Sequence, residues 1–443
     1  MRTVLNVQDK LTALLALDAE VRDVFVKATA IVRKLRAAGH EAWFVGGAVR
    51  DLLLGRRILD IDITGTAGPA EVASLFARTV AVGESFGVTR VMVGKHQFEV
   101  ALYRQEEGYS DGRHPDSVAP GTLEQDVVRR DFTVNGLVLD PESGNVVDLV
   151  GGLDDLGRRR LRAIGVPAER MAEDYLRTLR AVRFASCLDF ELDVETAASV
   201  AEAAAGLDRI SRERVRGELE KMAKGGGAAR GLSLMFELGL LGKVLPAWPD
   251  ADSVRVREAV ALLSGLPGAV SLVQWLVVVV LAFEPGLLSG PVDFKHIRRR
   301  CAELADSLRL SVDERRLLEH RLVLSARMVN VRGERLARRV DLYRSSSFEE
   351  VCGMVRFLLT GRGLDVGRLS ELVAERAALP SERLSPARFL NGDDLAAAGI
   401  AAGPRVGKLL AECEDLAAEG SLVSREGALE WLARRIGAPD SSE

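Results

Sequence analysis

Two acidic residues, Asp60 and Asp62, follow a glycine turn in the segment FVGGAVRDLLLGRRILDIDIT at residues 44–64. The segment predicts a short apolar strand, a turn that opens a helix, and a second strand that carries both acids. Because side chains alternate between the faces of a strand, both acids are expected on one side, with Ile61 behind them. Paired carboxylates bind a hard cation such as Mg²⁺, which bridges a triphosphate. The segment therefore predicts a site for nucleotide transfer.

The glycine turn that precedes Asp60 and Asp62 has features of an anion-binding site. Gly46 and Gly47 permit close approach of the backbone, and the helix that starts near Ala48 directs free N–H groups outward. Arg50 lies in the first turn of that helix. We therefore expect Gly46, Gly47 and Arg50 to bind nucleotide phosphates. A turn without this role is disfavoured, because the turn directly precedes the two acids.

The Asp-x-Asp pattern alone is a weak signal. With 64 acidic residues in a chain of 443, such pairs arise by composition, and most lie on a solvated surface. Asp60 and Asp62 differ because their predicted neighbours are buried, and like charges held together require a cation. Glu99, on the predicted strand 97–104, is a candidate third catalytic carboxylate. A surface acid on an edge strand is an equally good interpretation of Glu99.

A second motif, VVRRDFTVNGLVLD, spans residues 127–140. Arg130 and Asp131 precede an apolar run that predicts a strand, and Asn135 follows four residues after Asp131. An Arg and an Asp side by side can contact a phosphate and a ribose hydroxyl together. These three residues are predicted to bind nucleotide.

A third motif, EDYLRTLRAVRF at residues 173–184, supplies a means of base selection. Asp174 and Arg177 are three apart on a predicted helix and share a face. Cytosine and adenine both place an amino donor beside a ring-nitrogen acceptor, which suits a carboxylate and a guanidinium. Uracil and guanine present a carbonyl to the carboxylate instead, at a cost of a few kcal/mol. A surface salt bridge is the alternative. Arg180 and Arg183 are also assigned to nucleotide binding.

The elements that position these residues follow two patterns. Short apolar runs predict strands at the start of the chain, with helices between them. After Gly152, Ala, Leu, Glu and Arg recur at helical spacing, and the apolar run 270–283 predicts a buried helix or strand. The predicted fold class is α+β, a small mixed α/β head followed by helices. The expected strands are 41–46, 59–64, 87–94 and 97–104, and the expected early helices are 20–38, 48–55 and 69–79.

The composition is that of a soluble chain that can bury a large core. Hydrophobic residues make up 47% and charged residues 28%, and a net charge of −4 gives no overall basic field. The four cysteines are far apart and form no CxxC pair, which argues against a disulfide scaffold or structural zinc. No signal peptide or membrane span is predicted. A cytoplasmic protein is expected, and its oligomeric state is not indicated.

Together the motifs resemble those of the class II tRNA nucleotidyltransferases and bacterial poly(A) polymerases, in the polymerase-beta superfamily. They occur in the family's order over residues 40–225, and residues 389–410 resemble the family's C-terminal segment. The matching segments are GGAVRD with DID, RRDFTVNG, DLVGGLDDL at 148–156, EDYLRTLRAVRF, and ISRERVRGELEKM at 210–222.

The resemblance implies a division into four parts. Asp148 and Gly152 match the element that flexes between head and neck in the family. The implied parts are a polymerase-beta-like catalytic head at 1–155, an all-helical neck for base recognition at 156–225, a helical body at 226–340, and a helical tail that binds tRNA at 341–443.

The resemblance also implies transfer without a nucleic-acid template, onto tRNA, from ATP and CTP. Mg²⁺ is then held by the acid pair at 60 and 62. The ribose is held by Arg130 and Asp131, and the base is read by Asp174 and Arg177. The residues of the body and tail that contact tRNA are not indicated.

Two stretches of the sequence indicate which nucleotides the enzyme adds. Residues 82–94 are acidic where poly(A) polymerases of the family carry a basic stretch. Residues 106–118 resemble an intact flexible loop, which enzymes that add only CC lack, with Asp111, Arg113 and Pro115 in place. Addition of C and A is therefore the first expectation. Addition of A alone to CC-ended tRNA is second, and poly(A) synthesis is less favoured.

Two other classes of function fit these residues less well. An inactive RNA-binding relative is disfavoured because the carboxylates, the glycines and the base-reading pair are all intact. A nucleotidyltransferase for a small molecule does not need the motif at 173–184 or the long helical part.

Overall fold

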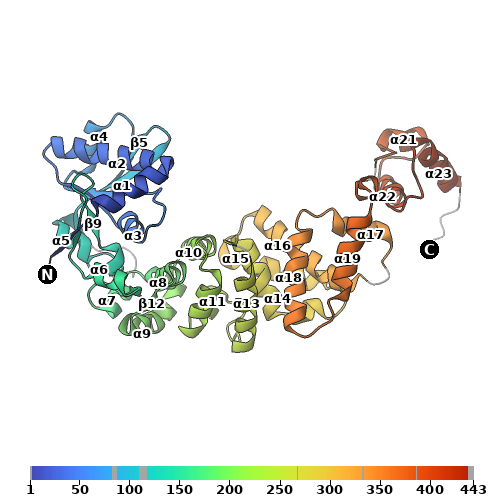
Figure 1. Cartoon of the computed structure of the whole chain (residues 1–443). Coiled ribbons are helices and arrows are strands. Elements are labelled where there is room, and N and C mark those ends of the chain that lie inside the picture. The colour runs from blue at the N-terminus through green and yellow to red at the C-terminus, as the bar shows by residue number, and fades with distance from the viewer. Residues whose placement is uncertain are drawn as a thin grey trace. The chain divides into compact units, whose positions relative to one another are not determined.

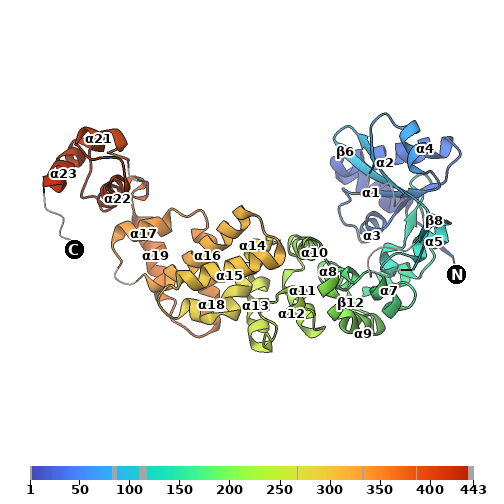
Figure 2. The same cartoon turned by 180° about the vertical axis from the view of Figure 1, so that it is seen from behind.

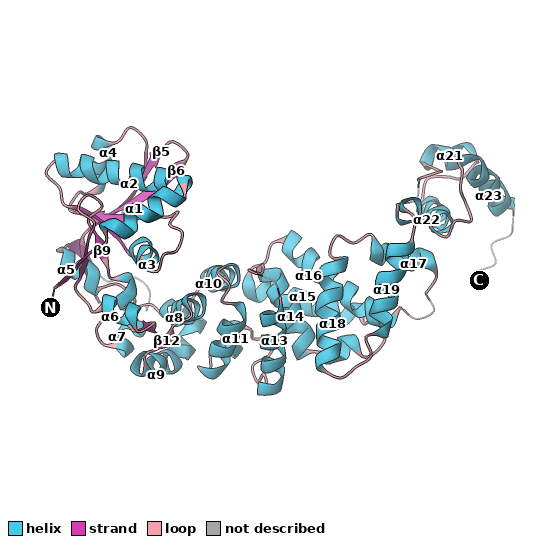
Figure 3. Ribbon diagram, viewed as in Figure 1, coloured by secondary structure: helices cyan, strands magenta, loops and turns pink. Residues whose placement is uncertain are grey.

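The computed structural model describes residues 2–81, 87–108, 117–266, 268–331, 334–385 and 387–437. The chain forms two compact units, Met1–Asp250 and Ala251–Glu443. Strands occur in the first unit, whereas every regular element in the described part of the second unit is helical (Figure 3). The α+β fold class is therefore confirmed. The finer division into head, neck, body and tail stays a prediction.

An eight-stranded mixed sheet organises the start of the first unit (Figure 1). Neighbouring strands pair antiparallel except β3 and β6, which are parallel. In sheet order the strands are β1 (Thr3–Asn6), β10 (Asn145–Asp148), β9 (Val138–Leu139), β2 (Ala42–Val45), β3 (Asp62–Gly65), β6 (His96–Leu102), β5 (Val88–Val93) and β4 (Thr79–Ala81).

Helices bury both faces of the central strands. On one face Phe25 of α2 meets Phe44 of β2 edge to face, with ring centroids 5.2 Å apart. On the other face Leu123 and Val127 of α5 pack with Val45 of β2. The residues directly after β2 and α5 are thereby fixed by two apolar cores. The helices around the sheet are α1 (Gln8–Leu17), α2 (Ala19–Ala37), α3 (Gly47–Leu53), α4 (Pro69–Leu75) and α5 (Leu123–Val128), with the 3-10 turn η2 (Thr133–Asn135).

A short hairpin, β7 (Arg104–Glu107) and β8 (Ser117–Pro120), runs from β6 to α5, and Figure 2 shows it next to α5. The segment between its strands, 109–116, lies outside the described residues. That segment includes the predicted loop positions Asp111, Arg113 and Pro115. The prediction for these three residues therefore stays untested.

Helices continue the first unit, together with one small strand pair. The parallel pair β11 (Arg160–Leu161) and β12 (Glu191–Leu192) lies where only helices were expected. It holds the start of this helical part to the end of α8. The helices are α6 (Gly152–Gly157), α7 (Pro167–Glu173), α8 (Leu176–Leu188), α9 (Val194–Glu202), η3 (Ala203–Arg209), α10 (Arg212–Lys224), α11 (Ala228–Glu237) and α12 (Leu241–Val244).

In the second unit, α14 (Leu272–Phe283) forms the centre of a helical core, and its residues are buried almost throughout. The apolar run 270–283 is thus a buried helix, and no described helix is long and apolar enough to cross a membrane. The other helices are α13 (Ser253–Gly265), η4 (Pro285–Leu288), α15 (Phe294–Leu308), α16 (Val312–Asn330), α17 (Leu336–Tyr343), α18 (Phe348–Gly361), α19 (Gly367–Ala378), α20 (Ser381–Leu384), α21 (Gly392–Ala397), α22 (Pro404–Ala418) and α23 (Arg425–Gly437).

One predicted strand is wrong at its start. The strand expected at 59–64 begins only at Asp62, so Asp60 lies in the preceding coil. The pairing ends with Val45 opposite Asp62, because Gly46 takes φ +76° and turns the chain into α3. On the β2 side the pairing therefore does not continue to Ile61. The helix expected at 69–79 also ends early, at Leu75, before β4.

Candidate active site

One pocket of about 510 Å³ in the first unit gathers the predicted nucleotide-binding residues. Eight of its side chains are cationic and four are acidic, which suits a polyanionic ligand that also needs carboxylate contacts. Glu99 does not line this pocket. The lining residues are Gly46, Gly47, Arg50, Asp60, Asp62, Arg129, Arg130, Asp131, Asn135, Asp174, Leu176, Arg177, Arg180, Arg183, Phe184, Arg214 and Lys221.

Asp60 and Asp62 both open to solvent at the pocket, and Ile61 between them is buried. The predicted alternation thus holds although Asp60 precedes the strand. Loss of hydration from the surrounding protein, followed by repulsion from Asp60 and Glu99, raises the pKa of Asp62 to about 6. Like charges are therefore held close together at this point of the pocket.

This acid pair fits a divalent cation. Two carboxylates that repel each other gain from a cation between them, and carboxylate oxygens are the ligands that Mg²⁺ prefers. Among the described residues no group of three or more His, Cys, Asp or Glu forms a metal cluster. Glu99 is paired with Arg90 across β5 and β6, at 2.7 Å. A third carboxylate ligand at Glu99 stays a prediction.

The glycine turn brings Arg50 against a second segment. Arg50 is buried, and its guanidinium donates to Asn135 Oδ1 at 2.6 Å and to its neighbour Asp51. The contact joins α3 to η2, 85 positions apart in the chain. Gly46 has only an arginine tip and a carbonyl near the position that a Cβ would take, so the backbone stays open to a ligand.

Asp131 forms the buried centre of a network. Its carboxylate accepts hydrogen bonds from Arg180 at 2.6 Å, from Asn135 Nδ2 at 3.0 Å and from the Phe132 N–H at 2.8 Å. Burial by itself raises the pKa of this carboxyl, but the Arg180 charge and the hydrogen bonds outweigh it and hold the pKa far below its usual range. Asp131 is therefore ionised and fixed.

Asp174 and Arg177, the predicted base-reading pair, both line the pocket but do not lie on one helix. Asp174 has extended backbone between α7 and α8, and only Arg177 is within α8. The predicted shared helix face is therefore wrong at Asp174. Its carboxylate accepts from the Leu176 N–H at 3.1 Å, which breaks the helix and starts α8. Arg177 is joined to Glu173 and to the carbonyl oxygens of Arg129 and Arg170.

Five residues of the pocket were not predicted. Arg214 and Lys221 of α10 are seven apart, two helical turns, and thus share a face. The motif ISRERVRGELEKM contained this signal, but nothing in it shows that α10 packs against α8. The unpredicted residues are Arg129, Leu176, Phe184, Arg214 and Lys221.

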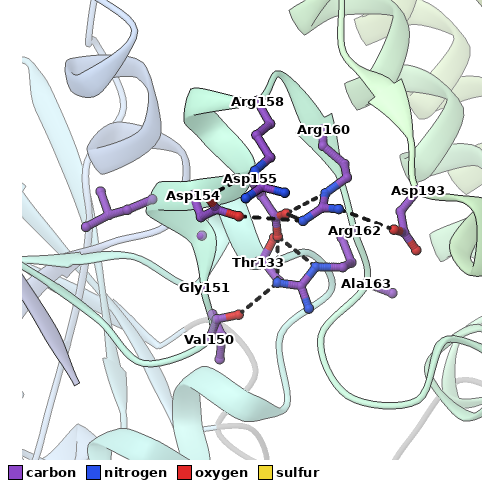
Figure 4. Close-up of polar contacts among 12 residues, drawn as sticks. Thr133, Val150, Gly151, Asp154, Asp155, Arg158, Arg160, Arg162, Ala163 and Asp193 are labelled. Atoms are coloured by element: carbon purple, nitrogen blue, oxygen red, sulfur yellow. Dashed lines mark hydrogen bonds and ion pairs between the residues drawn. The ribbon is translucent and has the colours of Figure 1, made fainter. Parts of the chain in front are cut away.

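The junction after the sheet is fixed by two aspartates. Asp148 Oδ1 accepts the N–H groups of residues 150, 151 and 152, and its Oδ2 accepts that of 153, so it holds the start of α6. Asp155 lies at the centre of Figure 4, where Thr133, Arg160 and Arg162 converge on its carboxylate. These contacts tie η2, and with it Asn135, to β11.

Comparison with known proteins decides the family. The pattern of the poly A polymerase head domain matches residues 42–162, and that of a probable RNA and SrmB-binding site of polymerase A matches 189–251. A CCA-adding enzyme of Lactiplantibacillus plantarum is 34% identical over 415 residues, which is 93% of this chain and 96% of that protein. The chain belongs to the CCA-adding enzyme family. It is a nucleotidyltransferase, as its motifs predicted.

Other members of the family are also similar to this chain in sequence or in fold. The CCA-adding enzyme of Streptococcus suis is 44% identical over 214 residues, covering 48% of this chain and 53% of that protein. The structure of the Bacillus stearothermophilus CCA-adding enzyme in complex with CTP superimposes with a TM-score of 0.64, at 29% identity over 93% of this chain and 97% of that one. The Thermotoga maritima enzyme complexed with tRNA has the same fold, with a TM-score of 0.65, 20% identity, and coverage of 98% and 100%.

Proposed function

We propose that this chain adds C and A nucleotides to the 3′ end of tRNA from CTP and ATP, releasing pyrophosphate, and that the 510 Å³ pocket is its active site. One observation supports this most: a single pocket contains the acid pair Asp60 and Asp62, the polar network around Asp131, and Asp174 with Arg177. The residues that line it come from segments as far apart as residues 46 and 221. The proposal agrees with membership of the CCA-adding family.

The substrate is held at three places in this proposal. The phosphates lie along Gly46, Gly47 and the guanidinium groups of Arg50 and Arg130, which offset their charge. The ribose lies beside Arg130 and Asp131, and the hydrogen bonds from Arg180, Asn135 and Phe132 fix the position of Asp131. Arg180 and Arg183 complete the cationic wall beside them. The tRNA 3′ hydroxyl attacks the α-phosphorus, a new P–O bond forms, and the bond to pyrophosphate breaks.

Asp60 and Asp62 are the residues that would hold Mg²⁺. The ion, when bound, neutralises phosphate charge and lowers the pKa of the attacking hydroxyl.

Base choice follows from the chemistry of Asp174 and Arg177. Asp174 accepts from the amino group of cytosine or adenine, and Arg177 donates to the adjacent ring nitrogen. With uracil or guanine a carbonyl oxygen faces the carboxylate, and both oxygens lose a partner at a cost of about 1–3 kcal/mol each. Protein side chains therefore take the place of a template.

The test uses two tRNA transcripts, one ending at the nucleotide before CCA and one ending in CC. Each is incubated with Mg²⁺ and one nucleotide at a time, and the products are resolved on a sequencing gel. We expect CTP to extend the first by two and ATP to extend the second by one, with no extension by UTP or GTP. Failure of CTP on the first transcript, with ATP active on the second, replaces the proposal with A addition alone. Long A tails indicate poly(A) synthesis.

We also infer a cytoplasmic location. All four cysteines are free thiols, which agrees with a reducing compartment. Cell fractionation followed by detection of the chain tests this, and recovery with the membrane or outside the cell contradicts it.

A further inference from the structure

Arg214 holds one member of the base-reading pair. From the first turn of α10, its Nη2 donates to Asp174 Oδ2 at 2.6 Å and its Nη1 donates to Oδ1 at 3.2 Å. Both side chains line the pocket and are mostly buried, with 27% and 18% of their surface exposed. The two residues are 40 positions apart in the chain. A two-pronged contact of this kind fixes the plane of the carboxylate as well as its charge.

The hydrogen bonds at Asp174 leave its two oxygens unequal. Oδ1 accepts from Arg214 Nη1 and from the Leu176 N–H, which occupies both of its lone pairs. Oδ2 accepts only from Arg214 Nη2 among the described residues. One lone pair of Oδ2 is therefore available in the pocket, in a direction set by the guanidinium plane.

We propose that Arg214 is a positioning residue that determines base selectivity, by turning a single acceptor site of Asp174 toward the amino group of the base. The inference rests on the proposed function of the pocket. Arg214 does not contact the amino group itself. It keeps the carboxylate from turning away from the base, so that a carbonyl-bearing base always meets an oxygen it cannot pair with.

A merely structural salt bridge between α10 and the start of α8 is the contrasting interpretation. Loss of such a bridge lowers the binding of all four nucleotides by one common factor, because it disturbs the pocket as a whole. Loss of a positioning contact instead changes the ratio between nucleotides. The ratio of kcat/KM for CTP to that for UTP, and of ATP to GTP, therefore distinguishes the two roles.

The experiment compares Arg214→Gln, Arg214→Lys and the wild-type chain. Arg212→Gln is the matched control, because Arg212 is on the same helix and donates to the Lys243 carbonyl at 2.9 Å, outside the pocket. Single-nucleotide incorporation into both tRNA transcripts gives kcat and KM for each nucleotide. Circular dichroism and thermal unfolding report whether each variant is folded.

For Arg214→Gln we expect KM for CTP and ATP to rise about tenfold, with a smaller change in kcat, and discrimination against UTP and GTP to fall about tenfold. Arg214→Lys has a positive charge but lacks the two parallel N–H donors of a guanidinium group. We therefore expect its KM to be closer to the wild-type value than its selectivity is. Arg212→Gln keeps the wild-type ratio. A folded Arg214→Gln variant with unchanged kcat/KM ratios between nucleotides overturns the inference. Equal recovery of KM and of selectivity in Arg214→Lys also overturns it. If the wild-type chain itself incorporates neither CTP nor ATP, the proposed function fails instead.

Discussion

Thr133 Oγ1 donates a hydrogen bond of 2.7 Å to the fully buried carboxylate of Asp155, and this bond joins the turn that ends at Asn135 to the first helix after the sheet. Arg160 of β11 and Arg162 just after it bind the same carboxylate, at 2.7 Å and 2.9 Å (Figure 4). One acid therefore joins the turn η2 and the helix α6 to the segment that leads to α7 and α8.

Replacement of Asp155 by Asn is expected to destabilise the first unit by about 2 kcal/mol, since it leaves two guanidinium groups with weaker partners that are only partly exposed. Burial alone raises the pKa of Asp155, but the bonds from Thr133, Arg162 and Arg160 outweigh it, so the pKa is lowered. A carboxyl with a lowered folded-state pKa stabilises the fold above its unfolded pKa, near 4, and loses this effect as the pH falls through the folded value.

Chemical unfolding of both chains at several pH values checks this prediction. The wild-type advantage over Asp155→Asn should be constant above about pH 5 and should shrink below about pH 4. An advantage that persists unchanged at pH 3 would show that the charge of Asp155 has no part in it.

Gly152→Ala tests the close approach between α6 and η2. A Cβ at Gly152 lies 2.2 Å from the Thr133 carbonyl oxygen, which is backbone and cannot move aside. We expect a loss of about 3 kcal/mol in unfolding free energy and a fall in activity. Gly157→Ala, at the other end of the same helix, meets nothing within 4 Å and should be neutral or slightly stabilising. Similar melting temperatures for the two variants would contradict the packing argument.

Asp62→Asn should reduce incorporation at least about a thousandfold while leaving the fold intact. Because Asp60 repels Asp62, the substitution should keep or slightly raise stability in the absence of metal. The wild-type chain should gain stability when Mg²⁺ is added, and the variant should gain less. Thermal unfolding with and without Mg²⁺ measures this independently of activity. Asp154→Asn, at an exposed acid outside the pocket, is the control, and an equal Mg²⁺ response in Asp62→Asn sinks the metal assignment.

Asp174→Asn is expected to reduce discrimination against UTP and GTP by about a hundredfold. The amide NH₂ can donate to a base carbonyl, which the carboxylate cannot do, and its oxygen can still accept from an amino group. Incorporation kinetics with each of the four nucleotides provide the measurement. Retention of wild-type selectivity in a folded Asp174→Asn chain would remove Asp174 from base recognition.

The local patterns predicted the early elements well. The helix expected at 20–38 is α2, and the strands expected at 87–94 and 97–104 are β5 and β6. The strand expected at 59–64, which carries the acids, was wrong at its start because its length depends on a partner. Its partner β2 ends where Gly46 turns, which the residues at 59–61 do not reveal.

The sequence by itself determined which chemistry is present, because the acid pair, the glycine turn and the Asp–Arg pair are each encoded within a few residues. Only the tertiary structure decided how these groups are partnered. Arg214 binds Asp174, Asn135 binds Arg50 and Thr133 binds Asp155 because helices and turns distant in the chain pack together. Such contacts depend on which apolar faces pack against one another, and short sequence motifs do not show this.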